Sequence, residues 1–213
     1  MKFTGTDLST IPAGFADYAQ TSQKVYRAAL QALSYPGRLI DLDHDASTPK
    51  DTNRVVAGLL LALLDSETSL WCSSKDQLIQ ACEWLQFHTD CAVLESSEQA
   101  DFLWIKNIEE FPEIERIKTG TDQYPDRSAT CIIEVPSLSQ KSIDFFTLKG
   151  PGIQFTSELH VKGWSKEIYK KLLSIWTQNH QLFPCGIDLY LSDGQHLIGL
   201  PRSTQLSYLE GVE

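Results

Sequence analysis

Residues 186–200 read GIDLYLSDGQHLIGL, and this stretch decides the fold class. Residues 186–192 alternate in the manner of a β-strand, and apolar residues return over 196–200. Asp193-Gly194 between them is a strong two-residue hairpin signal, because both residues tolerate the positive φ that such turns require. The sequence therefore predicts an antiparallel hairpin near its C-terminal end.

Helix and strand patterns alternate along the rest of the chain. Apolar residues at 164, 168, 172 and 176 recur every four residues and predict a helix. Apolar content and spacing predict further helices over 15–33, 54–64 and 76–87, and β-rich runs predict strands over 38–42, 69–72, 101–105, 129–135 and 143–148. We expect a single α/β domain over 15–213, with a mixed β-sheet flanked by helices, after a flexible N-terminal segment, residues 1–14.

Composition and charge narrow the classes of function. The chain has 213 residues, 42% of them hydrophobic, which is enough for one sizeable core and excludes a disordered chain. Its 18 basic and 28 acidic residues give a net charge of −10. Because nucleic-acid binding needs a basic surface that releases counterions, we expect no nucleic-acid partner. Nine acids and three bases lie between Glu95 and Asp126, which predicts a solvated face there.

Cysteine use and apolar runs predict a cytoplasmic protein. None of the five cysteines is spaced as C-x-x-C or stands with a histidine at zinc-ligand spacing, so we expect small buried thiols in a reducing compartment and no metal. The N-terminus lacks the apolar core of a signal peptide. The longest apolar run, Val55 to Leu64, is far shorter than the ~20 residues of a membrane helix, so we expect no membrane association.

Two short motifs are candidates for anion or partner binding. Phe87-His88-Thr89 ends a predicted helix and puts an imidazole beside a hydroxyl; the alternative is a histidine favourably placed at a helix C-terminus. Thr119-Gly120-Thr121 offers backbone amides and two hydroxyls to a phosphate, and the alternative is an ordinary turn. Nucleotide-binding, zinc-protease and serine-hydrolase motifs do not occur in the sequence.

Two further motifs follow predicted strands. Gly150-Pro151-Gly152 is a rigid corner that admits either a ligand or a neighbouring backbone. Pro201-Arg202-Ser203-Thr204 follows the hairpin, and an arginine fork with two hydroxyls suits a phosphate or a partner's carboxylate. The alternative for Arg202 is a solvated turn residue. Taken alone, these motifs predict an anion-binding α/β domain.

In their order along the chain, these blocks resemble the PhnH family of the bacterial carbon–phosphorus lyase system for phosphonate use. Residues 25–37, VYRAALQALSYPG, resemble its F-R-x-x-L-x-A-M-S-x-P-G, and the other matches are F-H-T at 87–89, T-G-T at 119–121, G-x-G-I at 150–153, FPCGID at 183–188 and GLPRST at 199–204. Together they span residues 15–206. Residues 125–128, PDRS, depart from the family's Pro-Glu-x-Gly, so the geometry of that loop is expected to differ from the family's.

The resemblance implies a fold similar to a truncated large domain of the pyridoxal-phosphate-dependent transferases, without the cofactor. It also implies a homodimer that joins the PhnG, PhnI and PhnJ subunits. As a set, PhnG, PhnH, PhnI and PhnL displace adenine from ATP with a phosphonate, giving α-D-ribose 1-phosphonate 5-triphosphate, and the nucleosidase chemistry is usually placed on PhnI. ATP is then a substrate of the complex, and no cofactor is expected on this chain.

Three hypotheses follow for the chain's own role. The first is a non-catalytic subunit that holds the complex together or shapes a phosphate-rich site, since no nucleophile–base or metal constellation is recognisable. The second is an enzyme domain with its own nucleotide- or phosphonate-binding site around His88 and Arg202. The third, a working pyridoxal-phosphate enzyme, rests on fold analogy alone, and no lysine of the sequence stands out as its Schiff base.

Overall fold

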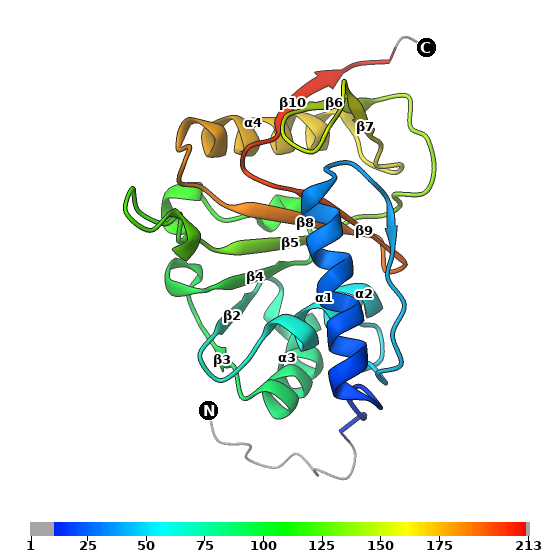
Figure 1. Ribbon diagram of the computed structural model, residues 1–213, viewed down its shortest axis with the longest axis vertical. Coiled ribbons are helices and arrows are strands. Elements are labelled where there is room, and N and C mark those ends of the chain that lie inside the picture. Colours follow the sequence, from blue (N-terminus) through cyan, green and yellow to red (C-terminus); the bar gives the residue numbers. More distant parts are fainter. Residues whose placement is uncertain (1–10, 212–213) are drawn as a thin grey trace.

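The computed structural model describes residues 11–211 and contains two β-sheets (Figure 1). The larger sheet has seven strands, in spatial order β1 (Ile40–Asp41), β9 (His196–Leu200), β8 (Asp188–Ser192), β5 (Thr130–Glu134), β4 (Phe102–Ile105), β2 (Ser69–Cys72) and β3 (Ala92–Val93). The five strands from β8 to β3 are parallel, and β9 is antiparallel to both of its neighbours. The predicted mixed sheet and the predicted β8–β9 hairpin are confirmed.

A second, smaller sheet replaces part of the single sheet expected from the sequence. It is antiparallel and has the order β10 (Gln205–Leu209), β6 (Phe145–Lys149), β7 (Ser157–Leu159). The three central residues of β5 are all buried, as expected for a strand covered on both faces of its sheet. In β6 only alternate residues are buried, as expected for a sheet covered on one face. The predicted strands 129–135 and 143–148 therefore lie in different sheets.

The four helices cover both faces of the larger sheet. They are α1 (Tyr18–Ser34), α2 (Arg54–Leu63), α3 (Lys75–Thr89) and α4 (Lys166–Gln181). Side chains of α1, α2 and α3 share one buried cluster with one face of the sheet, and those of α4 and the smaller sheet share a second cluster with the other face. Figure 1 shows α1 crossing the strands and α4 at the top with β6, β7 and β10. Successive β5 residues Cys131, Ile132 and Ile133 alternate between the two clusters, so both faces of this strand are buried.

Local caps explain where the helices begin. Asp17 Oδ1 accepts a hydrogen bond from Gln20 N at 3.1 Å, so α1 begins at Tyr18 and not at residue 15 as the apolar spacing suggests. Asn53 caps α2 in the same way through Val56 N, at 3.1 Å. Near its other end α1 approaches β9 very closely: a Cβ on Gly199 would lie 2.6 Å from the Ala32 carbonyl carbon. Glycine at this strand position is what lets the helix backbone approach the sheet.

The predicted flexible segment, residues 1–14, lies outside the described residues except for residues 11–14. That part lies against α3, where the carbonyl oxygen of Pro12 accepts hydrogen bonds from Trp84 Nε1 at 2.8 Å and from His88 Nε2 at 2.9 Å. The predicted solvated acidic face is confirmed: eight of its nine acids are exposed, and Asp101 is half-buried. Asp101 forms an ion pair with Lys118, one of the three bases in that stretch.

Candidate functional site

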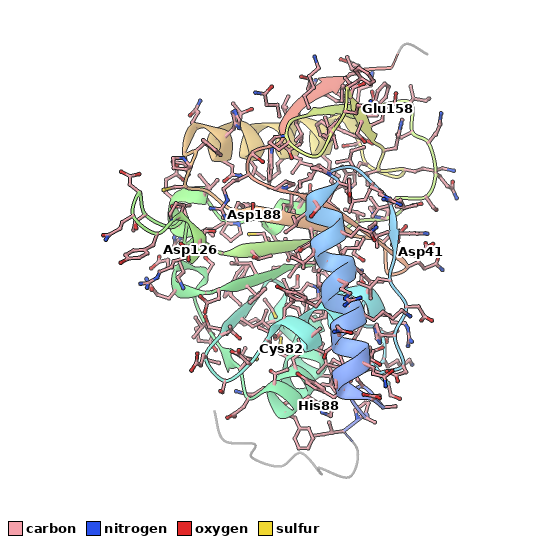
Figure 2. All side chains as sticks on the ribbon, viewed as in Figure 1. Asp41, Cys82, His88, Asp126, Glu158 and Asp188 are labelled. Carbon is pink, nitrogen blue, oxygen red and sulfur yellow. The ribbon has the colours of Figure 1, made fainter. Side chains whose placement is uncertain are left out.

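The residues singled out by their motifs lie in two separate places. His88 and Thr89 are in the last turn of α3, whereas residues 119–121 and 202–204 lie where β5 begins and the β8–β9 hairpin ends. Figure 2 shows His88 near the bottom of the molecule, well apart from Asp188 at the start of β8. The structure therefore does not bring His88 and Arg202 together.

His88 and Thr89 are both occupied by contacts within the chain. The His88 ring donates to the Pro12 carbonyl and lies edge-on to Trp84, with ring centroids 5.3 Å apart. Thr89 is buried, and its hydroxyl donates to the Leu85 carbonyl at 2.8 Å. These bonds fix the end of α3 and fasten residues 11–14 to it.

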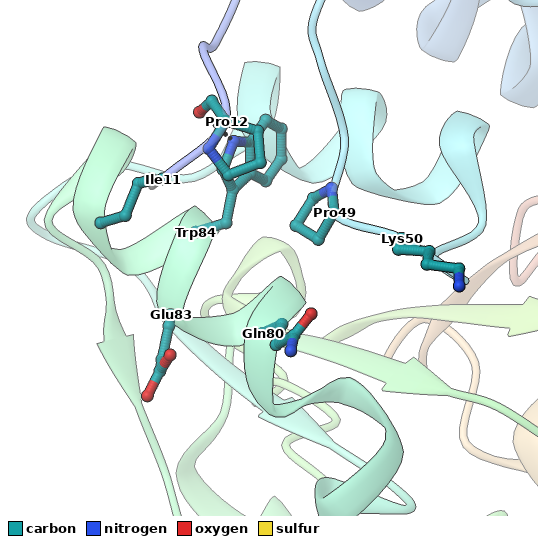
Figure 3. A pocket seen from close by; sticks show the side chains of 7 residues that line it. All are labelled: Ile11, Pro12, Pro49, Lys50, Gln80, Glu83 and Trp84. Atoms are coloured by element: carbon teal, nitrogen blue, oxygen red, sulfur yellow. Dashed lines mark hydrogen bonds between the residues drawn. The ribbon is translucent and has the colours of Figure 1, made fainter. Parts of the chain in front are cut away.

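A hollow of about 360 Å³ lies beside this contact (Figure 3). Trp84 and Pro12 form an apolar wall, and Lys50, Gln80 and Glu83 supply the polar groups around it. His88 does not line this hollow, although it shares the Pro12 carbonyl with Trp84. The hollow is lined by one positively charged residue, Lys50, and one negatively charged residue, Glu83, so it does not favour an anion.

Arg202 is the centre of the second place. Its guanidinium binds the Asp188 carboxylate at two points, Nε to Oδ1 at 3.2 Å and NH2 to Oδ2 at 2.6 Å. It also donates to the Pro125 carbonyl at 2.7 Å and to the Ser128 hydroxyl at 2.5 Å. The Arg202 side chain is only 15% exposed. The carboxylate that the motif suggested for a partner is thus supplied by the chain's own Asp188.

Thr119-Gly120-Thr121 belongs to the same cluster. Thr119 forms a bridge with Ser128, and its carbonyl accepts a hydrogen bond from Gly186 N at 2.8 Å. Gly120 has φ of +79°, and a Cβ there would lie 2.8 Å from the Pro125 carbonyl oxygen. The amide of Thr121 donates to the Tyr124 carbonyl, at 3.2 Å. The motif therefore forms a closed turn whose Thr121 amide is already bound.

Ser203 and Thr204 continue from Arg202 toward β10. Thr204 is completely buried; its amide donates to the Pro201 carbonyl, and its own carbonyl accepts from Trp176 Nε1 at 2.7 Å. Its hydroxyl has no hydrogen-bond partner among residues 11–211. The Ser203 carbonyl would lie 3.0 Å from a Cβ on Gly150, so the predicted corner at residues 150–152 admits a neighbouring backbone.

The opposite end of the sheet carries a hollow that the motifs did not indicate. Open α/β sheets bind ligands at the carboxyl ends of parallel strands, at the point where successive connections leave on opposite faces. The neighbouring strands β2 and β4 meet this condition. The connection after β2 is α3, which packs in the buried cluster on one face of the sheet, whereas residues 108–117, after β4, pack in the cluster on the other face. A hollow of about 400 Å³ lies at this point, and we name it the carboxyl-end hollow.

Polar groups from three strand ends line the carboxyl-end hollow. Lys106 follows β4, Glu134 ends β5, and their side chains form an ion pair at 2.9 Å. Glu134 also accepts from Trp104 Nε1 at 2.8 Å, so its carboxylate is held from two sides. Ser74, after β2, has φ of +45° and donates to Glu110 at 2.5 Å.

The walls of the carboxyl-end hollow come from both helix layers. Gln77 of α3 and Asn107 add amide groups, while Trp164, just before α4, and Ile168, in the first turn of α4, add an apolar wall. Such a mixture of an apolar wall and a few convergent polar groups is typical of a small-molecule site. The sequence indicates this site only through polar residues that directly follow buried strands. Which of these residues lie close together depends on the order of the strands in the sheet, which the sequence does not give.

Two classes of site are not found in the part of the chain that the structure describes. No three metal-ligating side chains gather between residues 11 and 211. Within the same range, every helix is too short or too polar to cross a membrane.

Comparison with known proteins gives the family. The model of the family described as "Bacterial phosphonate metabolism protein (PhnH)" matches residues 13–207. A protein of Rhizobium meliloti (strain 1021), named alpha-D-ribose 1-methylphosphonate 5-triphosphate synthase subunit PhnH, is 30% identical over 194 residues, 90% of this chain and 93% of that protein. A protein of Stutzerimonas stutzeri, named as a candidate C-P lyase subunit, HtxG, is 27% identical over 191 residues, 89% of this chain and 87% of that protein. The match extends from before α1 to within β10, and the chain therefore belongs to the PhnH family of bacterial phosphonate metabolism proteins.

Proposed function

We propose that the chain is a subunit of a carbon–phosphorus lyase complex and that it acts in the step in which a phosphonate displaces adenine from ATP, giving α-D-ribose 1-phosphonate 5-triphosphate. The names of the two relatives support the complex and, for the first, the synthase step. On this proposal its partners are the PhnG, PhnI and PhnJ subunits, it forms a homodimer, and it works in the cytoplasm.

Within that complex we propose a structural role and no independent catalysis. The observation that carries this proposal is the position of Arg202, whose guanidinium makes its hydrogen bonds to Asp188, Pro125 and Ser128 of the same chain. An arginine held by a carboxylate fork is not free to neutralise a triphosphate. Arg202 instead fixes the exposed loop 119–128 against β8, and a fixed exposed loop suits recognition by a partner subunit.

A homodimer is supported by the apolar side chains that the fold leaves outside. Tyr26 and Leu30, one turn apart on α1, are 49% and 47% exposed. The tryptophans contribute less to such a surface, because Trp84, Trp104 and Trp176 are buried, and Trp71 and Trp164 are partly buried. Aromatic and apolar residues are enriched at the centres of interfaces, so we place the dimer contact at α1.

The fold similar to a truncated large domain of the pyridoxal-phosphate transferases, without the cofactor, remains a proposal; the structure itself has a mixed sheet with helices on both faces. The residues present do not fit the cofactor. Lys106 is the lysine of the carboxyl-end hollow, and Glu134 holds its ammonium at 2.9 Å. With Glu110 also on the wall, the hollow disfavours a phosphate group, and we derive no chemistry through the cofactor.

The second candidate function is a ligand-binding domain with a site of its own. The carboxyl-end hollow favours it, because the sheet's topology and the lining side chains both point to a small-molecule site there. On this reading the ligand site moves from His88 and Arg202 to Lys106, Glu134 and Trp164. The two acids against one lysine favour an uncharged or cationic group of the ligand over its phosphates.

Reconstitution separates the two functions. The tagged chain is purified from cells grown on methylphosphonate, and its partners are identified by mass spectrometry; we expect PhnG, PhnI and PhnJ. Adenine release is then measured for complexes carrying Arg202→Ala or Glu134→Gln. Failed assembly of the Arg202 variant supports the structural role. Normal assembly with lost adenine release in the Glu134 variant supports a ligand site, and a chain that copurifies with none of these subunits contradicts both.

A further inference from the structure

Two cysteine sulfurs face each other between the larger sheet and α3. Cys72 is the last residue of β2, and Cys82 lies in the middle of α3. Their Sγ atoms are 2.9 Å apart, although both cysteines are free. A covalent S–S bond is about 2.05 Å long, so the two sulfurs need to approach by less than an ångström.

A small hollow reaches this pair from the surface. It encloses about 170 Å³ and is lined by both cysteines and by the apolar side chains of Ile79 and Val93. The polar and charged side chains that line it are those of Lys75, Asp76, Glu83, Gln86 and Glu95. Ile79 on its rim is 55% exposed, whereas Cys82 and Cys72 are 8% and 1% exposed. A small neutral oxidant therefore has a path to sulfurs that are shielded from larger reagents.

The surroundings make the two sulfurs unequal. The hydrogen bond from the Cys72 thiol lowers the pKa of Cys82, and the ammonium of Lys75 also lowers it, while burial and the Glu83 carboxylate oppose this without reversing it. The same hydrogen bond, together with burial, raises the pKa of Cys72. Since the thiolate is the reactive form, Cys82 is the first nucleophile of the pair.

The other cysteines lack this combination. Cys131 is buried in the second cluster, where burial raises the pKa of its thiol. Cys185 lies at the other end of the fold, with Asp122 as its hydrogen-bond acceptor at 3.8 Å. Cys91 is buried near Cys82, but burial raises the pKa of its thiol too.

We propose that Cys72 and Cys82 are a reversible oxidation site, which a peroxide converts to a disulfide between β2 and α3. The Cys82 thiolate attacks one peroxide oxygen, the O–O bond breaks, and the released hydroxide takes a proton to become water. Cys72 then attacks the sulfenic sulfur of Cys82; the S–S bond forms, the S–O bond breaks, and the thiol proton leaves with the hydroxide as a second water. Two thiols are oxidised and one hydrogen peroxide is reduced to two waters.

The position of the pair gives the oxidation a structural consequence. Ser74 follows Cys72 by two residues, begins the turn into α3, and lines the carboxyl-end hollow. A disulfide fixes α3 to the end of β2 at this place, so the loop 73–74 is held from both sides. The oxidation site itself stands whether or not that hollow binds a ligand.

The test is a thiol map of the full chain. Reduced protein is treated with hydrogen peroxide, blocked with N-ethylmaleimide and digested without reductant. We expect the peptides of Cys72 and Cys82 to be joined, with two of the five thiols lost and both restored by dithiothreitol. Cys185→Ser should keep the link, and Cys82→Ser should abolish it.

Three outcomes would overturn the proposal. They are full alkylation of Cys72 and Cys82 under conditions that oxidise Cys185, a link from Cys82 to Cys91, and sulfinic acid on Cys82 with no link. Because the map uses the wild-type chain, it decides the matter even where a variant fails to fold.

Discussion

Arg202 and Asp188 form a two-point ion pair that joins the end of the β8–β9 hairpin to its beginning. The Asp188 carboxylate also accepts from the Arg202 backbone amide, at 2.8 Å, so one acidic side chain satisfies three donors of one residue. The pair is mostly buried, with side-chain exposures of 15% and 24%. The sequence predicts this hairpin from its turn at Asp193-Gly194. The Arg202–Asp188 pair links the two strand ends that lie farthest from the turn, and the turn sequence does not predict this interaction.

We expect Arg202→Ala to lower the free energy of unfolding by about 3 kcal/mol, because removing one partner of a buried pair leaves the other charge uncompensated. Arg202→Lys should recover part of this loss, since an ammonium keeps the charge but not the fork. Urea unfolding measures both changes. Arg127→Ala is the control in the same loop: Arg127 is exposed and stacks on Tyr124 at 4.2 Å, so its loss should cost about 0.5–1 kcal/mol. Equal effects of the Arg202 and Arg127 variants would contradict the clamp.

The sequence predicted the local elements better than their assembly. Turn chemistry at Asp193-Gly194 and helical spacing at 164–176 are local signals, and both elements are present. The division into two sheets is not local: β5 and β6 are separated by one loop, but β6 pairs with β10, about sixty residues away in the sequence. In the sequence, only the alternation of Leu206 and Tyr208 indicates β10, and it does not indicate which strand β10 pairs with.

The candidate site shows the same limit. Arg202 was recognised as a notable residue, but its partner lies fourteen positions earlier, and charge patterns alone do not choose between an internal carboxylate and a ligand. Lys106 and Glu134 carry no motif: each is an ordinary charged residue at the end of a strand. Only the parallel register of β4 and β5 puts them side by side.

Gly199→Ala should destabilise the fold by about 1–3 kcal/mol, the usual cost of overpacking. The added Cβ would lie 2.6–2.7 Å from backbone atoms of Ala32 and Leu33, and backbone does not move aside as a side-chain tip does. Gly14→Ala is the control, since the atoms nearest to its Cβ would belong to the His88 ring, at 3.2 Å or more, and it should change stability by less than about 0.5 kcal/mol. Thermal unfolding of both variants checks this. An unchanged melting temperature for Gly199→Ala would mean that α1 does not approach β9 so closely.

We expect light scattering to give twice the chain mass of 24.0 kDa for the isolated protein. Leu30→Glu should shift the equilibrium toward monomer, because it places a charge within the apolar side chains on the outside of α1. Ile79→Glu, a comparable change on α3 where Ile79 is 55% exposed, is the matched control and should leave the mass unchanged. A monomeric wild type at all usable concentrations would contradict the homodimer. Equal effects of both variants would contradict the prediction that α1 forms the dimer contact.

The purified chain should bind no pyridoxal phosphate. Lys106 is held by Glu134 in the carboxyl-end hollow, and a Schiff base requires a free, unprotonated amine. Incubation with the cofactor followed by borohydride should leave no absorbing lysine adduct after desalting. A stable adduct on Lys106 would contradict this, while labelling spread over exposed lysines would show non-specific reaction.

Stability should fall on mild acidification because of His44. The side chain is buried, its Nε2 donates to the Arg54 carbonyl at 2.7 Å, and its Nδ1 has no hydrogen-bond partner in the described part of the chain. Burial lowers the pKa of His44 below its ordinary value of 6.5, and the positive charge of Arg54 lowers it further. The hydrogen bond to the Arg54 carbonyl and the negative charges of Asp43 and Asp45 raise the pKa, but by less than burial lowers it.

The direction of the effect follows from the difference in bound protons. Below about pH 6.5 the unfolded chain binds a proton on His44 that the folded chain does not, so the unfolding free energy is full above that pH and declines as the pH falls toward the lowered folded-state pKa. His44→Gln keeps an N–H donor without a titrating ring, and we expect it to flatten the decline between about pH 6.5 and 5 in urea titrations. The exposed His180→Gln serves as the control and should keep the wild-type slope. The folded carboxylates Asp101 and Asp193, whose pKa values are lowered, remain ionised throughout this range and therefore do not cause the decline. A wild-type slope in the His44 variant would show that a group other than His44 causes it.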